Sequence, residues 1–137
     1  MAEEFKQMFA QGEVNPYNST FTGVSYLAPV VTEGVPIFNV TFEPGCRNFW
    51  HIHNADKGGG QTLICTAGRG WYQEWGKPAL EMVPGVAVYI PAGVKHWHGA
   101  ADDSWFSHLA MEDPGVNTST TWCEPVSDED YAKVNGK

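Results

Sequence analysis

A chain of 137 residues with a formal net charge of −8 is long enough for one domain with a hydrophobic core and too short for two. The negative charge argues against nucleic acid and anionic membrane surfaces as partners, and no apolar run is long enough to span a bilayer. Three cysteines do not make a disulfide framework, and Glu3 and Glu4 stand where a signal peptide needs positive charge, so a cytoplasmic location is expected.

The first residues have the spacing of a helix. Phe5, Met8 and Phe9 recur at helical intervals, and Gly12 stands where a helix would end, so the pattern predicts one short N-terminal helix. After Pro16 the pattern changes to short β-type segments, separated by turns that are rich in glycine and proline.

These β-type segments continue almost to the C-terminus. The predicted strands are residues 24–27, 37–42, 48–53, 62–66, 70–75, 79–83, 86–90, the neighbourhood of Trp97, 105–111 and 120–123. Many short strands at nearly even spacing indicate an antiparallel sandwich or barrel. Ser127 followed by Asp130 resembles a capping box, which predicts a second short helix over residues 128–134.

Four of the five histidines lie in two short segments. His51 and His53 are two residues apart in a predicted strand, so both project from the same face. If that face is the barrel interior, the amide oxygen of Gln61 on the next strand can reach a metal that both histidines hold. The Pro91-Ala92-Gly93 turn lets His96 enter the same cavity. Gln61 has a second interpretation as a structural hydrogen-bonding residue.

Two glycine-proline frames around these residues resemble the cupins. Gly45-x5-His51-x-His53, with Gln61 and Gly68, is similar to the first cupin motif, and Gly85-x5-Pro91-x-Gly93-x2-His96 is similar to the second. Two positions depart from the family pattern: Gln61 replaces the glutamate ligand and lies further along the chain, and Ala100 replaces an asparagine.

The glutamine and the segments 95–101 and 108–110 are similar to a narrower group. This group comprises the small bacterial cupins found with carboxymuconolactone decarboxylase-like domains, and the manganese-dependent cupin hydroxynitrile lyases. The resemblance implies an all-β fold, the cupin double-stranded β-helix or jelly-roll β-barrel, in one cupin domain over residues 1–137 with its core at about 35–112. It also implies a homodimer and one divalent transition metal on His51, His53, Gln61 and His96. Manganese or iron is expected there, with nickel, cobalt and zinc as alternatives.

Replacing glutamate by glutamine changes the chemistry expected of such a metal. Three neutral imidazoles and a neutral amide leave its double charge uncompensated, which makes it a stronger Lewis acid towards a bound oxygen. This favours polarisation of a small organic substrate over oxygen activation.

Two further histidines are candidates for moving a proton. His108 shares strand parity with Phe106 and Ala110 and has a counterpart in the similar hydroxynitrile lyases, so it is the preferred catalytic base; a core histidine is the alternative. His98 shares parity with His96 and is a catalytic candidate, a residue that orients a ligand, or an ordinary surface residue.

Three functions remain open from the sequence. The first is a metal-dependent enzyme with Lewis-acid and general-base chemistry on a small molecule, as a lyase, isomerase or decarboxylase, with hydroxynitrile cleavage as one instance. The second is a non-catalytic metal-dependent binding protein, or an accessory partner of a carboxymuconolactone decarboxylase-like enzyme. The third is an iron-dependent dioxygenase.

Overall fold

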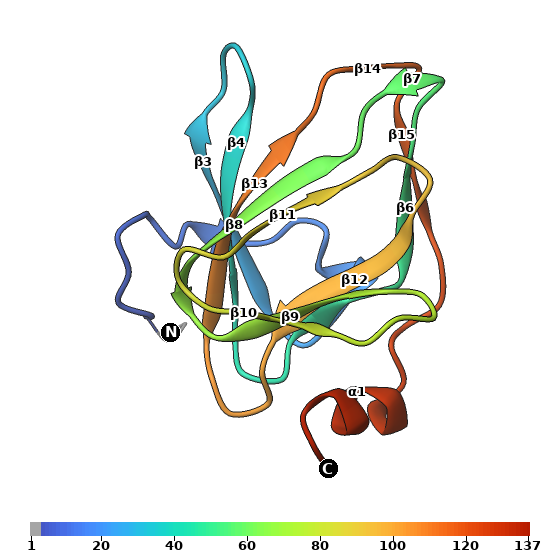
Figure 1. Ribbon diagram of the computed structural model, residues 1–137. Coiled ribbons are helices and arrows are strands. Elements are labelled where there is room, and N and C mark those ends of the chain that lie inside the picture. The colour runs from blue at the N-terminus through green and yellow to red at the C-terminus, as the bar shows by residue number, and fades with distance from the viewer. Residues whose placement is uncertain (1–3) are drawn as a thin grey trace.

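A computed structural model describes residues 4–137 as an antiparallel β-barrel with one C-terminal α-helix (Figure 1). The elements are β1 (Glu13–Val14), a 3-10 turn (Asn18–Thr20), β2 (Phe21–Thr22), β3 (Ser25–Val31), β4 (Ile37–Phe42), β5 (Arg47–Asn48), β6 (His51–Asn54), β7 (Lys57–Gly58), β8 (Gln61–Gly68), β9 (Gly70–Glu74), β10 (Leu80–Met82), β11 (Ala87–Ile90), β12 (Lys95–Ala100), β13 (Phe106–Glu112), β14 (Gly115–Val116), β15 (Ser119–Trp122) and α1 (Asp128–Val134). The predicted all-β class is confirmed.

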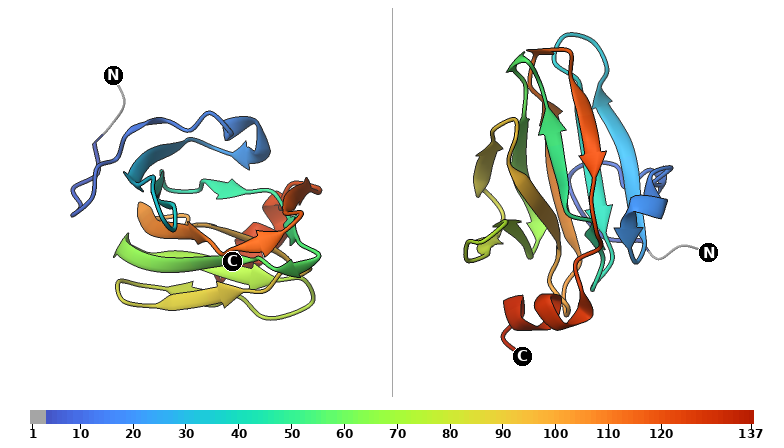
Figure 2. Two further views of the ribbon diagram at one scale, coloured as in Figure 1. Left: turned by 90° about the horizontal axis from the view of Figure 1, so that it is seen from above. Right: turned by 90° about the vertical axis from the view of Figure 1, so that its right-hand side faces the viewer.

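Two sheets form the barrel. A six-stranded sheet has the order β1-β3-β4-β13-β8-β11, and a seven-stranded sheet has the order β10-β9-β12-β5-β2, with β6 pairing with both β12 and β15. The predicted strand 48–53 is divided into β5 and β6, because Trp50 hydrogen-bonds through its backbone to Glu124 and Cys123 instead of continuing the ladder. The β3–β4 hairpin and α1 lie at opposite ends of the barrel (Figures 1 and 2).

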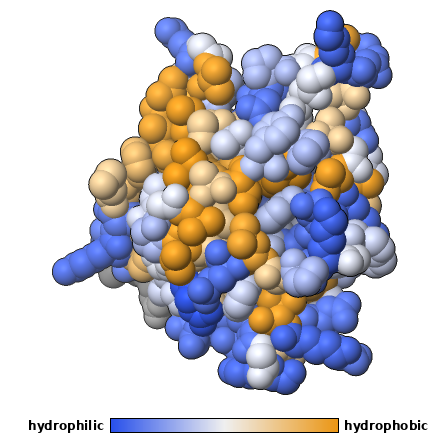
Figure 3. Space-filling model, in the orientation of Figure 1, coloured by the Kyte–Doolittle hydropathy of each residue, from blue (hydrophilic) through white to orange (hydrophobic). Residues whose placement is uncertain are grey.

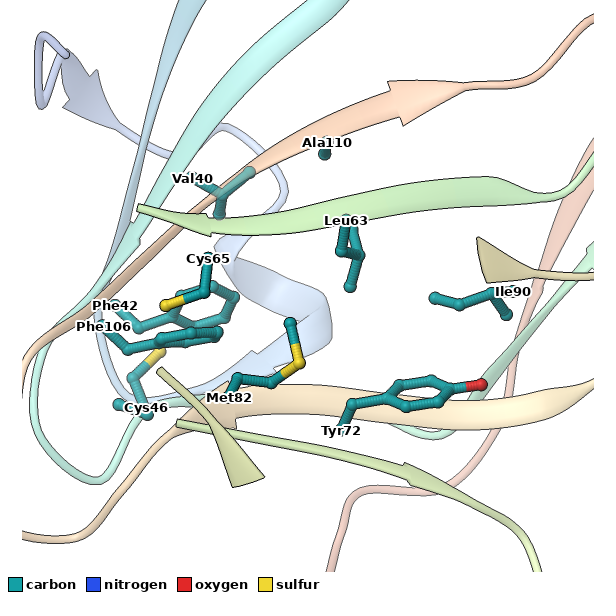
Figure 4. Close-up of a cluster of buried hydrophobic side chains, with 11 residues drawn as sticks. Val40, Phe42, Cys46, Leu63, Cys65, Tyr72, Met82, Ile90, Phe106 and Ala110 are labelled. Atoms are coloured by element: carbon teal, nitrogen blue, oxygen red, sulfur yellow. The ribbon is translucent and has the colours of Figure 1, made fainter. Parts of the chain in front are cut away.

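Side chains from both sheets fill one part of the barrel with a close-packed core (Figure 4). Phe42, Leu63 and Phe106 from the six-stranded sheet meet Met82 from the other, and all four are fully buried. Cys65 belongs to this core, where burial raises the pKa of its thiol to about 11. It is therefore a packing residue.

The predicted N-terminal helix is wrong for the described part of that segment, since residues 4–12 form no helix. The Phe5 ring stacks on Trp105 at 5.4 Å between centroids, while Met8 is 86% exposed, so the helical spacing does not mark a buried face. The buried Asn39 instead donates hydrogen bonds to the side chain of Gln7 and the carbonyl of Ala10, both at 2.9 Å. These tertiary contacts outweigh local helix propensity.

The C-terminal helix forms as predicted, with Ser127 Oγ accepting a hydrogen bond from the backbone of Asp130 at 3.1 Å. Its attachment depends on Arg47, which donates to the Val126 carbonyl at 2.9 Å and stacks over the Tyr131 ring at 4.1 Å. Tyr131 in turn donates to the Ala100 carbonyl on β12 at 2.5 Å. The helix is thereby fixed to the seven-stranded sheet.

The surface is mixed, with an apolar area over the β3 and β4 side in the view of Figure 3. Val30, Val31 and Val35 of this hairpin are exposed. Across residues 4–137, no helix has the length and apolar character needed to cross a membrane.

Candidate metal centre

Strands β6 and β12 bring three histidines together. His51 and His53 project from one face of β6, as their spacing predicts, and His96 on β12 is the direct cross-strand partner of His51. The ring centroids of His51 and His96 are 4.2 Å apart, and each lies 5.1–5.2 Å from that of His53. All three side chains are buried.

Backbone carbonyl groups fix which nitrogen of each imidazole faces the centre. His51 Nδ1 donates to the carbonyl of Phe49 at 2.7 Å, and His96 Nδ1 donates to that of Val94 at 2.9 Å. A carbonyl only accepts, so Nδ1 carries the proton and Nε2 keeps its lone pair for a ligand. Burial lowers the pKa of His96 to about 4 and that of His51 well below its usual value, so both imidazoles are neutral at pH 7.

Three buried atoms that could coordinate a metal have no hydrogen-bond partner within residues 4–137: His53 Nε2, His96 Nε2 and Gln61 Oε1. The other end of the Gln61 amide is engaged, because Nε2 donates to Glu112 Oε1 at 2.9 Å. Leaving buried polar atoms unpaired costs free energy, and a divalent cation would satisfy all three. Imidazole nitrogens with one amide oxygen suit a divalent transition metal, so these residues fit the predicted cofactor.

A second grouping of histidines overlaps with this set. Ligand nitrogens of His51, His96 and His98 all lie within 4.8 Å of one another, a compact group that does not include His53. His51 and His96 belong to both sets. The ring nitrogens of His98, however, already have protein partners, whereas His53 Nε2 has none in the described chain. Metal ligation by His51, His53, Gln61 and His96 therefore stays the prediction, because this set includes the three buried atoms that have no hydrogen-bond partner in the described chain.

His98 and His108 form a hydrogen-bonded pair beside the three histidines. His108 Nε2 and His98 Nδ1 are 3.0 Å apart, and the His98 ring centroid lies 5.6 Å from that of His51. Asn48 Oδ1 accepts from the His98 backbone at 2.9 Å, which directs the Asn48 NH₂ group at the His98 ring, 3.2 Å from Nε2. Burial lowers the pKa of His108 to about 4 and that of His98 well below normal. The alternative of His98 as a surface residue is wrong, since it is 5% exposed.

A cavity of about 540 Å³ opens onto both histidine groups. Its polar wall contains His51, His53, Gln61, His98 and His108, and its apolar wall contains Phe21, Leu27, Phe38, Val40, Ala110 and Trp122. Tyr17 and Trp122 are partly exposed and mark its mouth. An apolar chamber with a few convergent polar groups is the usual form of a small-molecule site.

Three residues at this site were missed by sequence reasoning. Asn48 holds His98, Trp122 places its ring 4.6 Å from that of His51, and Glu112 binds Gln61. Each acts across a strand pairing, and the sequence contains no signal for the register that brings the partners together.

Comparison with known proteins gives close matches to two bacterial proteins, although no family model matches the chain. An (R)-mandelonitrile lyase of Granulicella tundricola is 38% identical over 134 residues, which cover 95% of this chain and 99% of that protein. The crystal structure of a cupin-like protein of Thermotoga maritima has a TM-score of 0.80 at 36% identity, covering 94% of this chain and 97% of the other. A predicted oxalate decarboxylase of the same organism shares the fold alone, with a TM-score of 0.63 at 15% identity, covering 73% and 89% of the two chains.

Proposed function

Because this chain belongs to the cupins, with an (R)-mandelonitrile lyase as a relative along nearly its whole length, we propose that it is a divalent-metal-dependent lyase of the hydroxynitrile-lyase type. The observation that carries the proposal is one cavity lined by His53 and Gln61, each with a ligand atom that has no partner within residues 4–137, and by the hydrogen-bonded pair of His98 and His108 beside them. A cation and a base acting on the same small molecule require this juxtaposition.

His51, His53, Gln61 and His96 would hold the cation, which is expected to be manganese or iron. Once bound, it would supply a Lewis acid that polarises the oxygen of the substrate. The apolar wall would bind the organic part of a cyanohydrin and exclude water from the reacting group.

The His98–His108 pair would move the proton. In the cleavage direction, the substrate hydroxyl proton passes to one imidazole of the pair, with His108 as the preferred base. The bond between the carbinol and nitrile carbons breaks, its electron pair leaves with cyanide, and the carbinol becomes an aldehyde or ketone. The pair then returns the proton to cyanide, so hydrogen cyanide is the second product.

Metal analysis combined with a cleavage assay tests this function. Protein stripped with a chelator and reloaded separately with Mn²⁺ and Fe²⁺ is assayed on both enantiomers of mandelonitrile, with benzaldehyde as the measured product. We expect turnover that is lost with the metal and returns on reloading. Full metal occupancy without turnover on a panel of cyanohydrins would favour a non-catalytic binding protein, and consumption of O₂ by the iron form would favour a dioxygenase.

The homodimer, the cytoplasmic location and a functional link to a carboxymuconolactone decarboxylase-like protein stay predictions.

A further inference from the structure

Glu112 lies directly opposite Gln61 where strands β13 and β8 pair. Cross-strand partners project to the same side of a sheet, so both side chains reach the cavity that contains the histidines. The contact between them is a hydrogen bond of 2.9 Å from Gln61 Nε2 to Glu112 Oε1.

This hydrogen bond decides which way the Gln61 amide faces. The two ends of a glutamine amide have nearly the same size, so packing alone hardly distinguishes the oxygen from the NH₂ group. A carboxylate oxygen only accepts hydrogen bonds, and it therefore takes the NH₂ end. The oxygen end of Gln61 must then point away from Glu112, and Oε1 is the buried atom that has no partner in the described part of the chain.

The same contact places a negative charge near an otherwise neutral set of candidate ligands. His51 and His96 each donate Nδ1 to a backbone carbonyl, which leaves the lone pair of a neutral ring for the metal, and the Gln61 amide carries no charge. A carboxylate that accepts from the amide NH₂ draws positive charge to that end and increases electron density on Oε1. The charge that a glutamate ligand would bring directly is thus present one hydrogen bond further out.

We propose that Glu112 is a positioning residue of the metal centre, which holds the oxygen of Gln61 towards the cation and supplies the negative charge that the ligand atoms lack. The inference rests on the proposed function, in which Gln61 is a ligand. It predicts that Glu112 controls metal affinity without contacting the metal.

The test compares two substitutions of equal charge at adjacent positions. Glu112→Gln removes the carboxylate that fixes the amide, whereas Asp113→Asn removes a carboxylate that accepts a hydrogen bond from the Thr62 hydroxyl at 3.1 Å. Mn²⁺ is titrated into each metal-free protein, and Kd is measured by competition with a fluorescent chelator. We expect Glu112→Gln to weaken binding by roughly 10- to 100-fold, the usual effect of losing an outer partner of a ligand, and Asp113→Asn to have a much smaller effect.

An exchange variant separates positioning from a general structural role. In Gln61→Glu/Glu112→Gln the carboxylate becomes the ligand, and the amide introduced at position 112 can donate its NH₂ group to it. The reference is Gln61→Glu alone, in which a carboxylate ligand would face the Glu112 carboxylate. We expect the double substitution to bind Mn²⁺ more tightly than Gln61→Glu, whereas loss of packing at position 112 would make it bind more weakly.

The outcomes distinguish this inference from the proposed function. If wild-type protein binds neither Mn²⁺ nor Fe²⁺, both are overturned. If wild type binds Mn²⁺ and Glu112→Gln binds it equally well, only the role of Glu112 is overturned. The same conclusion follows if Asp113→Asn weakens Mn²⁺ binding as much as Glu112→Gln does. Thermal unfolding of each metal-free variant verifies the fold, and Glu112 is exposed enough for its substitution to be tolerated.

Discussion

Two groups of histidines lie beside one cavity; all are buried, but they differ in their hydrogen-bond partners. His51 and His96 each donate Nδ1 to a backbone carbonyl two residues earlier, which leaves Nε2 with a lone pair. His98 and His108 bond to each other, so a proton on one is within reach of the other. Burial lowers the pKa of each of these four rings and keeps them neutral, so the partner of each ring determines whether it can bind a cation or transfer a proton.

The largest effect is expected from removing two members of the first group. His51→Ala/His96→Ala should abolish metal binding, because these residues belong to both candidate ligand groupings. Elemental analysis of the purified double variant and of wild type measures this. Equal metal content in two folded proteins would remove both residues from the ligand set.

The second group should respond in the opposite way. His108→Ala should keep its metal and lose turnover by roughly 10²–10⁴-fold, the usual contribution of a general acid–base group. Steady-state rates on a cyanohydrin, with metal content determined on the same sample, verify this. A fully loaded variant with an undiminished rate would show that His108 has no part in proton transfer.

Acidification should lower the folding stability of the metal-free protein through both groups of histidines. His96 and His108 have a pKa of about 4 when folded, against about 6.5 in the unfolded chain. Between these values only the unfolded chain takes up the proton, so stability is complete above pH 6.5 and falls as the pH drops towards 4. Each residue contributes a loss on the order of 3 kcal/mol.

Thermal unfolding of metal-free protein across this pH range measures the loss. His108→Ala should show a weaker pH dependence than wild type. An unfolding midpoint that does not change between pH 7 and pH 4 would contradict the neutral, buried state of these imidazoles.

The smallest effect is expected at Asn48, which acts on proton transfer only through its hydrogen bonds to His98. Asn48→Ala removes the amide that holds His98 and should lower the turnover number by roughly 10-fold, the cost of about one hydrogen bond, while metal content stays unchanged. Asn54→Ala, at an exposed amide that bonds Ser119 and Thr121, is the matched control. Equal rates in both variants would show that the His98 ring is held by other contacts.

The sequence predicted most strands, because glycine and proline turns separate them, and it predicted α1, because Ser127 gives a local cap. The same local reasoning was wrong for the N-terminal segment, where Asn39, far along the chain, determines the conformation. At the site, the i,i+2 pair His51 and His53 is visible in the sequence. Asn48 and Glu112 were missed because their partners depend on strand register, which the packing of the whole barrel sets.

Gln61 illustrates how two interpretations of one residue can both apply. The sequence left a metal ligand and a structural hydrogen-bonding residue as alternatives. In the structure its NH₂ group donates to Glu112, while its oxygen is left without a partner among residues 4–137. One amide has two ends, so a structural bond at one end can prepare the other for a ligand.

The pairing of β15 with β6 has a consequence for synthesis on the ribosome. β15 covers the outer edge of the strand that carries His51 and His53, and Trp122 lies opposite His51 in that pairing. A chain made from its N-terminus therefore completes every histidine-bearing strand before the segment that closes the cavity has emerged. Until β15 pairs, that edge of β6 presents unsatisfied backbone N–H and C=O groups to which a strand of another chain could add, so the last strand of the barrel also protects it from such pairing.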